Sequence, residues 1–220
     1  MFESVTVIGA NGRSGSAVGG RLRQRGVPLL EHDGELIVLC VPDRAIGEVA
    51  ARIEPGHWIC HVSGATSLGA LDPHELRFSV HPLQTLVEGR GPEQLDGAWA
   101  AVAGESADAL AHAQELAETL GLRPFVLADD KRALYHAGAA MASNYLVTLH
   151  RAASRLLEDA DAPPEALIPL MERTIANGFE LTGPIARGDT ATVERHLAAI
   201  RRNEPELEPL YVALAEATRA

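Results

Sequence analysis

Three observations predict an α/β protein that continues into an all-helical region. A β-rich segment, 4–8, runs into a glycine-rich turn and then into a helical pattern over about 13–25. Strand and helix patterns alternate from there to about residue 127, and every periodic segment from Asp129 onward has helical spacing. We therefore expect a mostly parallel sheet with covered faces in residues 1–128 and a helical domain in residues 129–220.

The expected elements follow one another at short intervals. Further strands are predicted at 36–41, 58–62, 78–80, 99–103 and 124–127, and helices at 43–52, 106–120, 131–159, 165–180, 190–200 and 206–218. The stretch 137–147 is apolar or small nearly all round its helix, which is typical of a helix buried by its own domain or by another subunit. We expect a homodimer whose two-fold interface is built mainly by the helical domain.

Composition excludes several classes of partner. The net charge is -11, and the arginines do not gather with aromatic residues, so we expect no nucleic-acid partner. The longest apolar run, 36–41, is too short to span a bilayer, and no basic leader precedes the first strand. Cys40 and Cys60 lie in apolar runs, so we expect both to be buried free thiols. We expect a cytoplasmic protein without a membrane span, and its single lysine, Lys131, leaves little room for lysine chemistry.

The glycine turn is the strongest motif. Its order is Gly9-Ala10-Asn11-Gly12-Arg13-Ser14-Gly15, with one residue more between the first two glycines than in the usual dinucleotide turn. Glycines between a strand and a helix let the backbone approach a pyrophosphate, which the helix N-terminus then binds. This predicts a Rossmann-type domain; the alternative is a tight turn without a ligand. The candidate cofactor-binding residues of the turn are Gly9, Gly12, Arg13, Ser14 and Gly15.

The adenosine side of this domain is shortened. Glu31 or Asp33 has the spacing of the acid that holds the adenosine ribose in dinucleotide folds. However, 27–31 is separated from the strand at 35–41 by three residues, whereas parallel neighbours need a crossover of about a dozen. Either Asp33-Gly34 closes a small antiparallel hairpin, or 27–31 is only a connector. Both alternatives predict a truncated Rossmann-type fold with poor dinucleotide affinity.

Three predicted strands end in polar loops that should meet at one sheet edge, beside the glycine turn. Their polar residues are Asp43, Ser63, Thr66, His81 and Gln84. Pro42 and Ser63 are further candidate cofactor contacts. His81 is a candidate general acid or base because imidazole titrates near neutral pH; the alternative is a histidine that caps a strand before a proline. His57 and His61 lie about 13 Å apart on a strand, so we expect no metal site. No nucleophile elbow is complete, which makes a serine hydrolase a weak competitor.

The combination of motifs resembles a known family. It comprises the opening glycine turn and the segments 39–43, 61–65, 81–85, 135–136, 142–145 and 181–189. Over nearly the whole chain, these resemble a bacterial family of Rossmann-like oxidoreductase homologues whose helical C-terminal domain is of unknown function. That family is similar to the 6-phosphogluconate-dehydrogenase-like superfamily, beside pyrroline-5-carboxylate reductase, ketopantoate reductase, prephenate dehydrogenase and the F420-dependent NADP reductases. The resemblance implies NAD(P)-linked redox chemistry on a small acid, in a dimer.

The resemblance also implies site residues, and the chain departs from it in two places. The stretch between Arg25 and Glu35 is shorter than in the relatives, and Ala140 stands where ketopantoate reductases carry a lysine. His81 corresponds to a histidine that faces the substrate hydroxyl in prephenate dehydrogenases. On the helix at 131–159, polar residues interrupt an apolar surface: Tyr135, His136, Ser143 and Asn144.

From these patterns we expect a site to which both domains contribute. The candidate catalytic residues are His81, Asn144 and His136, facing one cavity, with Arg187 available to a substrate carboxylate or to Asp189. Internal hydrogen bonds within the helical domain are the alternative for its polar residues. The function predicted is an oxidoreductase dependent on NADP or NAD that acts on a small keto or imino acid. The rival is a non-catalytic ligand-binding dimer with a degraded dinucleotide site, and a purely structural dimer is a third class.

Overall fold

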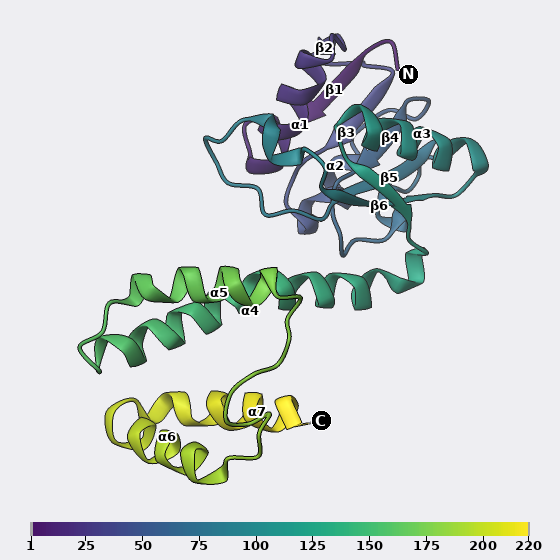
Figure 1. The fold of residues 1–220 in the computed structure, drawn as a ribbon. Coiled ribbons are helices and arrows are strands. Elements are labelled where there is room, and N and C mark those ends of the chain that lie inside the picture. Colours follow the sequence, from purple (N-terminus) through teal and green to yellow (C-terminus); the bar gives the residue numbers. More distant parts are fainter. Residues whose placement is uncertain (1, 220) are drawn as a thin grey trace. The chain divides into compact units, whose positions relative to one another are not determined.

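The computed structural model describes residues 2–219, and the chain divides into two compact units, Met1–Ala140 and Met141–Ala220 (Figure 1). The first unit carries all the strands of the described chain, and the second is helical. No helix among residues 2–219 has the length and apolar character that crossing a membrane requires.

One seven-stranded sheet forms the frame of the first unit, in the order β2-β1-β3-β4-β5-β6-β7. Strands β1 to β5 run parallel, whereas β6 is antiparallel to β5 and β7 is parallel to β6. The reversal at β6 follows from its connection: between β5 and β6 the chain forms only the short 3-10 helix η3 (Pro92–Leu95), with no crossover helix. The predicted mostly parallel Rossmann-type sheet is confirmed. The strands are β1 (Val5–Ile8), β2 (Leu29–Leu30), β3 (Leu36–Leu39), β4 (Trp58–His61), β5 (Arg77–Pro82), β6 (Trp99–Gly104) and β7 (Arg123–Val126).

Helices cover both faces of the sheet. On one face, α1 (Arg13–Gln24) and α3 (Ala107–Thr119) pack their apolar sides against alternate strand residues such as Val38, Phe78 and Val102. On the other face, α2 (Ile46–Ala50) and the 3-10 helix η2 (Leu68–Leu71) cover Ile37, Leu39 and Ile59. The short 3-10 helix η1 (Asp43–Ala45) leads into α2. His61 on β4 and Ser79 and His81 on β5 alternate with the residues that face α1 and α3, so they lie on the second face.

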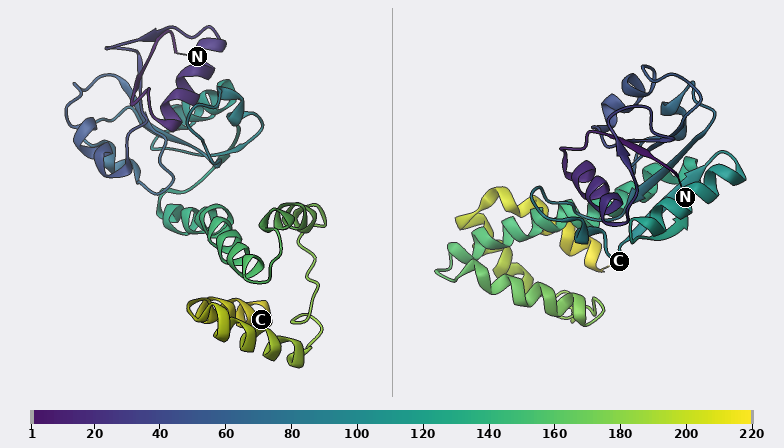
Figure 2. Two further views of the ribbon diagram at one scale, coloured as in Figure 1. Left: turned by 90° about the vertical axis from the view of Figure 1, so that its left-hand side faces the viewer. Right: turned by 90° about the horizontal axis from the view of Figure 1, so that it is seen from above.

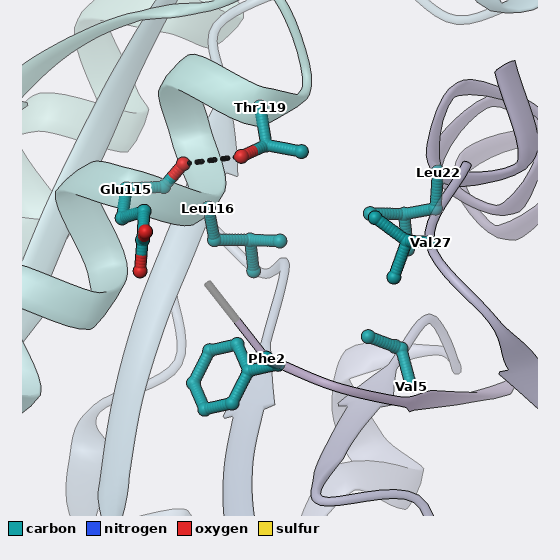
Figure 3. Close-up of a pocket in the computed structure, with 7 residues that line it drawn as sticks. All are labelled: Phe2, Val5, Leu22, Val27, Glu115, Leu116 and Thr119. Atoms are coloured by element: carbon teal, nitrogen blue, oxygen red, sulfur yellow. Dashed lines mark hydrogen bonds between the residues drawn. The ribbon is translucent and has the colours of Figure 1, made fainter. Parts of the chain in front are cut away.

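A small apolar cavity lies in the first of these layers, between α1, β1 and α3 (Figure 3). The hydrogen bond drawn among the lining residues joins two residues of α3: the Thr119 hydroxyl donates to the Glu115 carbonyl. With walls of this kind the cavity is a packing void of the core and not a polar ligand site. Its lining residues are Phe2, Val5, Leu22, Val27, Glu115, Leu116 and Thr119.

The connection from β2 to β3 corrects the sequence interpretation. Segment 27–31 is neither part of an antiparallel hairpin nor only a connector, because β2 pairs parallel with β1, Val5 opposite Leu29. Strand β3 pairs with the other side of β1, so the two strands are not neighbours and need no long crossover. The chain crosses β1 at Gly34, where a Cβ would lie 2.6 Å from the Thr6 nitrogen. Only glycine allows this short path. The sequence interpretation excluded it because it took the two segments to be adjacent strands of the sheet.

The helical region begins with the 3-10 helix η4 (Asp129–Lys131) and the long α4 (Arg132–Glu158), whose first turns belong to the first unit. The second unit continues with η5 (Pro164–Ala166), α5 (Leu167–Ala176), α6 (Thr190–Asn203), η6 (Pro205–Leu207) and α7 (Glu208–Arg219). Figures 1 and 2 show α6 and α7 packed side by side as an antiparallel pair, joined by a hydrogen bond between His196 and Tyr211. The predicted helices are confirmed.

Candidate functional site

The glycine turn is held by backbone contacts that exclude side chains. Gly9 has a φ of +87°, and a Cβ there would lie 2.4 Å from the Cys40 carbonyl oxygen. A Cβ on Gly15 would lie 2.1 Å from the Gly9 carbonyl oxygen. Gly12 N–H donates to that same oxygen at 3.0 Å, which closes the turn. Gly9 and Gly15 therefore serve the close packing of β1, β3 and α1.

The outer side of this turn fits a phosphate group. Gly12 is the exposed N-cap of α1, and an added Cβ would lie 3.4 Å from the Gly9 oxygen and 3.9 Å from the Cys40 oxygen, without a clash. No side chain caps the helix, and its first turn holds no acid, so the first N–H groups of α1 remain free for an anion. Arg13 is exposed beside them. A pyrophosphate would be held by the backbone from Gly12 to Gly15.

Ser14 and Cys40 lie together behind the turn. Burial raises the pKa of the Cys40 thiol to about 12, against a smaller lowering by a hydrogen bond with Ser14. Cys40 therefore stays a neutral thiol, and its partner Ser14 is engaged within the protein.

The side of the sheet that would hold adenosine, at β2, is short. Strand β2 contains only two residues, and Glu31, His32 and Asp33 are exposed in the turn that leads to the crossing at Gly34. Leu30 pairs with Thr6, near the start of β1, so the chain turns back before it reaches the level of Gly9. The edge that shapes an adenosine pocket in a full dinucleotide fold is correspondingly reduced.

At the same sheet edge, the structure brings His81 together with the loop after β4 and the first turns of α4. His81 Nδ1 lies 2.7 Å from the Tyr135 hydroxyl, and the ring centroids of His81 and His136 are 6.2 Å apart. A Cβ on Gly64 would lie 2.6 Å from Cε1 of His81, so the imidazole packs directly on the Gly64 backbone. His81 and His136, two of the three predicted catalytic residues, therefore lie together.

Burial lowers the pKa of His81 to about 4, and the charges of His136 and Arg132 act in the same direction, while Asp43 opposes them. His81 is thus neutral at physiological pH. As a neutral imidazole it can accept a proton at one nitrogen and donate a hydrogen bond from the other.

Sequence reasoning missed a buried arginine at the start of α4. Arg132 is 2% exposed. Its Nε donates to Asp129 Oδ1 at 2.5 Å, its Nη1 to the Ser63 carbonyl at 3.4 Å, and its Nη2 to the Ser79 hydroxyl. The only sequence signal for this ion pair is the spacing of Asp129 and Arg132, three residues apart at the start of a helix.

A second buried group, His61, lies on the same face. Burial and the nearby Arg132 charge lower its pKa to about 3. Its Nδ1 accepts from the Ser63 N–H at 3.2 Å. No group of three or more histidine, cysteine or acidic side chains in that part of the chain could hold a metal ion.

The other predicted loop residues, Ser63, Pro42 and Gln84, make their side-chain contacts within their own loops or are exposed. Ser63 is buried, and its hydroxyl accepts the N–H groups of Ala65 and Thr66 and donates to Thr66 Oγ1 at 2.9 Å, so it stabilises its own turn. Pro42 is the exposed residue before η1, and Gln84 accepts the N–H of Thr85.

Three predicted residues belong to the second unit. Asn144 is exposed on α4, and its Oδ1 accepts a long hydrogen bond, 3.5 Å, from the Ser143 hydroxyl. Asp189 caps α6 through the N–H of Thr192 at 3.1 Å, and Arg187 is exposed. A cavity shared by His81 and Asn144 stays a prediction.

Comparison with known proteins identifies a family. A family model described as a domain of unknown function, DUF2520, matches residues 98–218, more than half of the chain. No protein of curated function matches the sequence.

Solved structures share the whole architecture. A protein from Bacteroides fragilis named as a candidate NADP oxidoreductase superposes with a TM-score of 0.81 at 18% identity, over 99% of this chain and 98% of its own. A semialdehyde dehydrogenase NAD-binding protein from Cupriavidus necator, in complex with calcium and NAD, gives 0.62 at 18% identity, over 97% and 99% of the two chains. A 1-pyrroline-5-carboxylate reductase from Streptococcus pyogenes gives 0.63 at 14%, over 98% and 96%. At these identities the likeness shows the fold, a Rossmann-type sheet with a helical C-terminal region.

Proposed function

The chain belongs to the DUF2520 family, and on that premise we propose that it is an oxidoreductase that uses NADP or NAD and acts on a small keto or imino acid. The observation that carries the proposal is the uncapped glycine turn at the same sheet edge as a partly buried, neutral histidine. Phosphate binding at one and proton chemistry at the other are the two needs of a nicotinamide-dependent reaction on a small acid.

In this proposal the parts have distinct roles. Gly12, Arg13 and Gly15 hold the pyrophosphate, and Pro42 and Ser63 border the nicotinamide half. A bound nicotinamide supplies or accepts the hydride. His81, as a neutral imidazole, donates a hydrogen bond to the substrate carbonyl oxygen or imine nitrogen and so stabilises the negative charge that hydride addition places there. The proton that completes the alcohol or amine comes from solvent, and it returns to solvent in the reverse direction. His136 and Asn144 complete the catalytic set, and Arg187 pairs the substrate carboxylate.

Residues 1–128 would bind the nucleotide, and residues 129–220 would contribute substrate contacts and the interface of a homodimer. The exposed apolar side chains of α4 and α5 support the interface, which we propose is formed with a second copy of this chain. They include Met141 at 63% exposure and Leu170 at 62%. The two cysteines are buried and free, which fits a cytoplasmic setting.

Calorimetric titration of the full chain with NAD(H), NADP(H) and F420 tests the cofactor assignment. We expect one nicotinamide dinucleotide to bind with a dissociation constant weaker than micromolar, because the adenosine side is short. Gly12→Asp is the decisive variant: a carboxylate at the N-cap stabilises α1 but repels phosphate. Binding should fall at least about tenfold while thermal stability is kept or raised. Equal binding by the variant would contradict phosphate binding at this turn.

A second function is favoured by one observation. The two-residue β2 leaves little surface for adenosine, which suits a non-catalytic ligand-binding dimer that has lost dinucleotide-dependent turnover. The same titration, followed by an absorbance assay of nicotinamide oxidation, separates the two: ligand binding without hydride transfer to any small keto or imino acid supports the binding protein.

A further inference from the structure

We propose that Tyr135 and Gly64 are positioning residues that hold His81 in a single tautomer, with Nδ1 accepting a hydrogen bond from Tyr135 and Nε2 carrying the proton at the sheet edge. The proposal rests on the proposed function for its chemical meaning, because a fixed Nε2–H is the donor that a substrate oxygen or nitrogen would require.

The direction of the hydrogen bond follows from the two groups. The Tyr135 hydroxyl and His81 Nδ1 are 2.7 Å apart, a short contact between an O–H group and a nitrogen. An unprotonated imidazole nitrogen is a strong acceptor, whereas a phenol oxygen is a weak one. Burial raises the pKa of Tyr135 to about 12, so its hydroxyl keeps its proton. Tyr135 therefore donates, and the proton of the neutral imidazole lies on Nε2.

Packing fixes the ring that donates. The Tyr135 ring meets His81 edge to face, with centroids 5.5 Å apart at 86°, and meets Phe125 on β7 at 5.9 Å. Phe125 is in turn 6.3 Å from Trp99 on β6. This row of aromatic rings along the sheet edge restrains the side chain of Tyr135.

Packing also fixes the ring that accepts. An added Cβ on Gly64 would lie 2.6 Å from Cε1, 2.8 Å from Nε2 and 2.9 Å from Nδ1 of His81. The imidazole therefore rests on the Gly64 backbone, and any side chain at this position would displace it. The φ of Gly64 does not lie in the left-handed region, so the backbone itself does not require glycine here. The requirement for glycine comes from the histidine ring.

Arg132 sets the position of the helix that carries Tyr135. Its guanidinium joins the first turn of α4 to the Ser63 carbonyl after β4 and to the Ser79 hydroxyl of β5. Asp129, which holds Arg132, also accepts the Leu68 N–H at 3.1 Å, so η2 is tied to the same point. Tyr135 follows Arg132 by three residues and so lies on the same side of the helix.

The tautomer can be read directly from the nitrogen resonances of the imidazole in the uniformly labelled full chain without cofactor, near pH 7. The wild type should show His81 with an unprotonated Nδ1 and a protonated Nε2. In Tyr135→Phe, both nitrogens should move toward the average of two tautomers. Tyr145→Phe, which removes a hydroxyl from an exposed part of the same helix, should leave His81 unchanged. A wild type protonated at Nδ1, or a Tyr135→Phe variant with unshifted nitrogens, would overturn the proposal.

Gly64→Ala is an independent test if loss of the tyrosine disturbs the helix. The methyl group should displace the imidazole from Tyr135 and give the same averaged nitrogens. Gly69→Ala is the matched control, since a Cβ on Gly69 would lie 3.8 Å from the nearest atom, the Ser67 hydroxyl. A His81 signal unchanged in Gly64→Ala counts against the positioning role of Gly64.

These measurements separate the inference from the proposed function. If the tautomer is fixed as described but no dinucleotide binds, the oxidoreductase proposal fails and the positioning role stands. If a dinucleotide binds and turns over, while Tyr135→Phe leaves both the nitrogens and kcat unchanged, the positioning role fails alone.

Discussion

The two units of this chain differ in how they bury their apolar residues. The first has a layer of buried side chains on each face of its sheet, from Val38 and Phe78 on one side to Leu39 and Ile59 on the other. Among the described residues of the second, the buried hydrophobic side chains are Leu167, Val193, Ile200 and Ala215. Many of its larger apolar residues are exposed: Met141, Tyr145, Val147, Ile168, Leu170, Ile175, Phe179 and Leu181.

The difference shows that regular secondary structure does not ensure a core. A doubly covered sheet buries both faces within its own chain segment. Helices joined in sequence bury their apolar sides only where another surface covers them, and within the second unit many of these side chains stay exposed.

The largest effect is expected in the second unit. Replacing Met141 and Leu170 together by glutamate places two charges on the proposed dimer surface. Because each charge occurs twice in a two-fold dimer, four charges at on the order of 2 kcal/mol each should raise the dimer dissociation constant by roughly five to six orders of magnitude. Light scattering at micromolar concentration should show a wild-type dimer and a monomeric variant. Arg151→Glu, at an exposed polar position of α4, is the charge control. A monomeric wild type would contradict the proposal that a second copy of the chain covers the exposed side chains of α4 and α5.

The first unit should break at its glycine turn. Gly15→Ala forces a Cβ to within 2.1 Å of the Gly9 carbonyl oxygen and should lower the free energy of unfolding by roughly 3 kcal/mol. Gly26 has a positive φ, +75°, which Gly15 does not, but no atom lies within 4 Å of an added Cβ, so Gly26→Ala should cost only about 1 kcal/mol. Both tryptophans, Trp58 and Trp99, lie in the first unit, and their fluorescence during urea unfolding reports on it alone. Equal losses in the two variants would show that steric contact at Gly15 is unimportant.

Acid should destabilise the first unit through its buried histidines. The pKa values of His61 and His81 are lowered to about 3 and about 4, below the ordinary 6.5. Below pH 6.5 the unfolded chain binds protons that the folded chain does not, so the stabilisation present above that pH is lost as the pH falls. Each histidine contributes at most about 1.4 kcal/mol per pH unit.

Urea unfolding of the wild type and of His61→Gln, followed by tryptophan fluorescence at about pH 7 and about pH 5, measures this loss. The variant should lose about half of the histidine contribution to the pH dependence. Identical pH dependence in the two proteins would argue that His61 titrates normally in the folded state.

The smallest effect concerns α4, the helix that belongs to both units. Gly138 lies in its interior with no atom within 4 Å of an added Cβ, so Gly138→Ala should stabilise the helix by about 0.5–1 kcal/mol. Ala137→Gly, at the neighbouring exposed position, should destabilise it by a similar amount. Far-UV circular dichroism during thermal unfolding compares the two. A destabilised Gly138→Ala protein would indicate that a surface packs closely on Gly138.

Much of the fold could be predicted from local pattern. The strand from Leu36 and the helix from Arg13 were found because hydrophobic periodicity and glycine positions are properties of a few adjacent residues. The path from β2 to β3 could not be found in this way. It depends on Gly34 passing over Val5 and Thr6, about thirty residues earlier in the chain, and no local pattern records such a close approach.

The candidate site was predicted in part for the same reason. His81 was recognisable as a histidine at a strand end, and the turn at Gly9 as a phosphate-binding motif. The sequence pattern assigns no role to Tyr135. Arg132 does not stand out in the sequence, because an arginine at the start of a helix is usually solvated.

By itself, the sequence determined the order of the elements, the glycine turn and the division into an α/β and a helical part, since these follow from spacing along the chain. Only the tertiary structure decided which polar groups meet. His81 and Tyr135 are 54 residues apart, and Arg132 and Ser63 are 69 apart. Their contacts arise because parallel strands end at one edge of the sheet and α4 begins beside that edge. That proximity comes from packing across the sheet, which residue spacing does not encode.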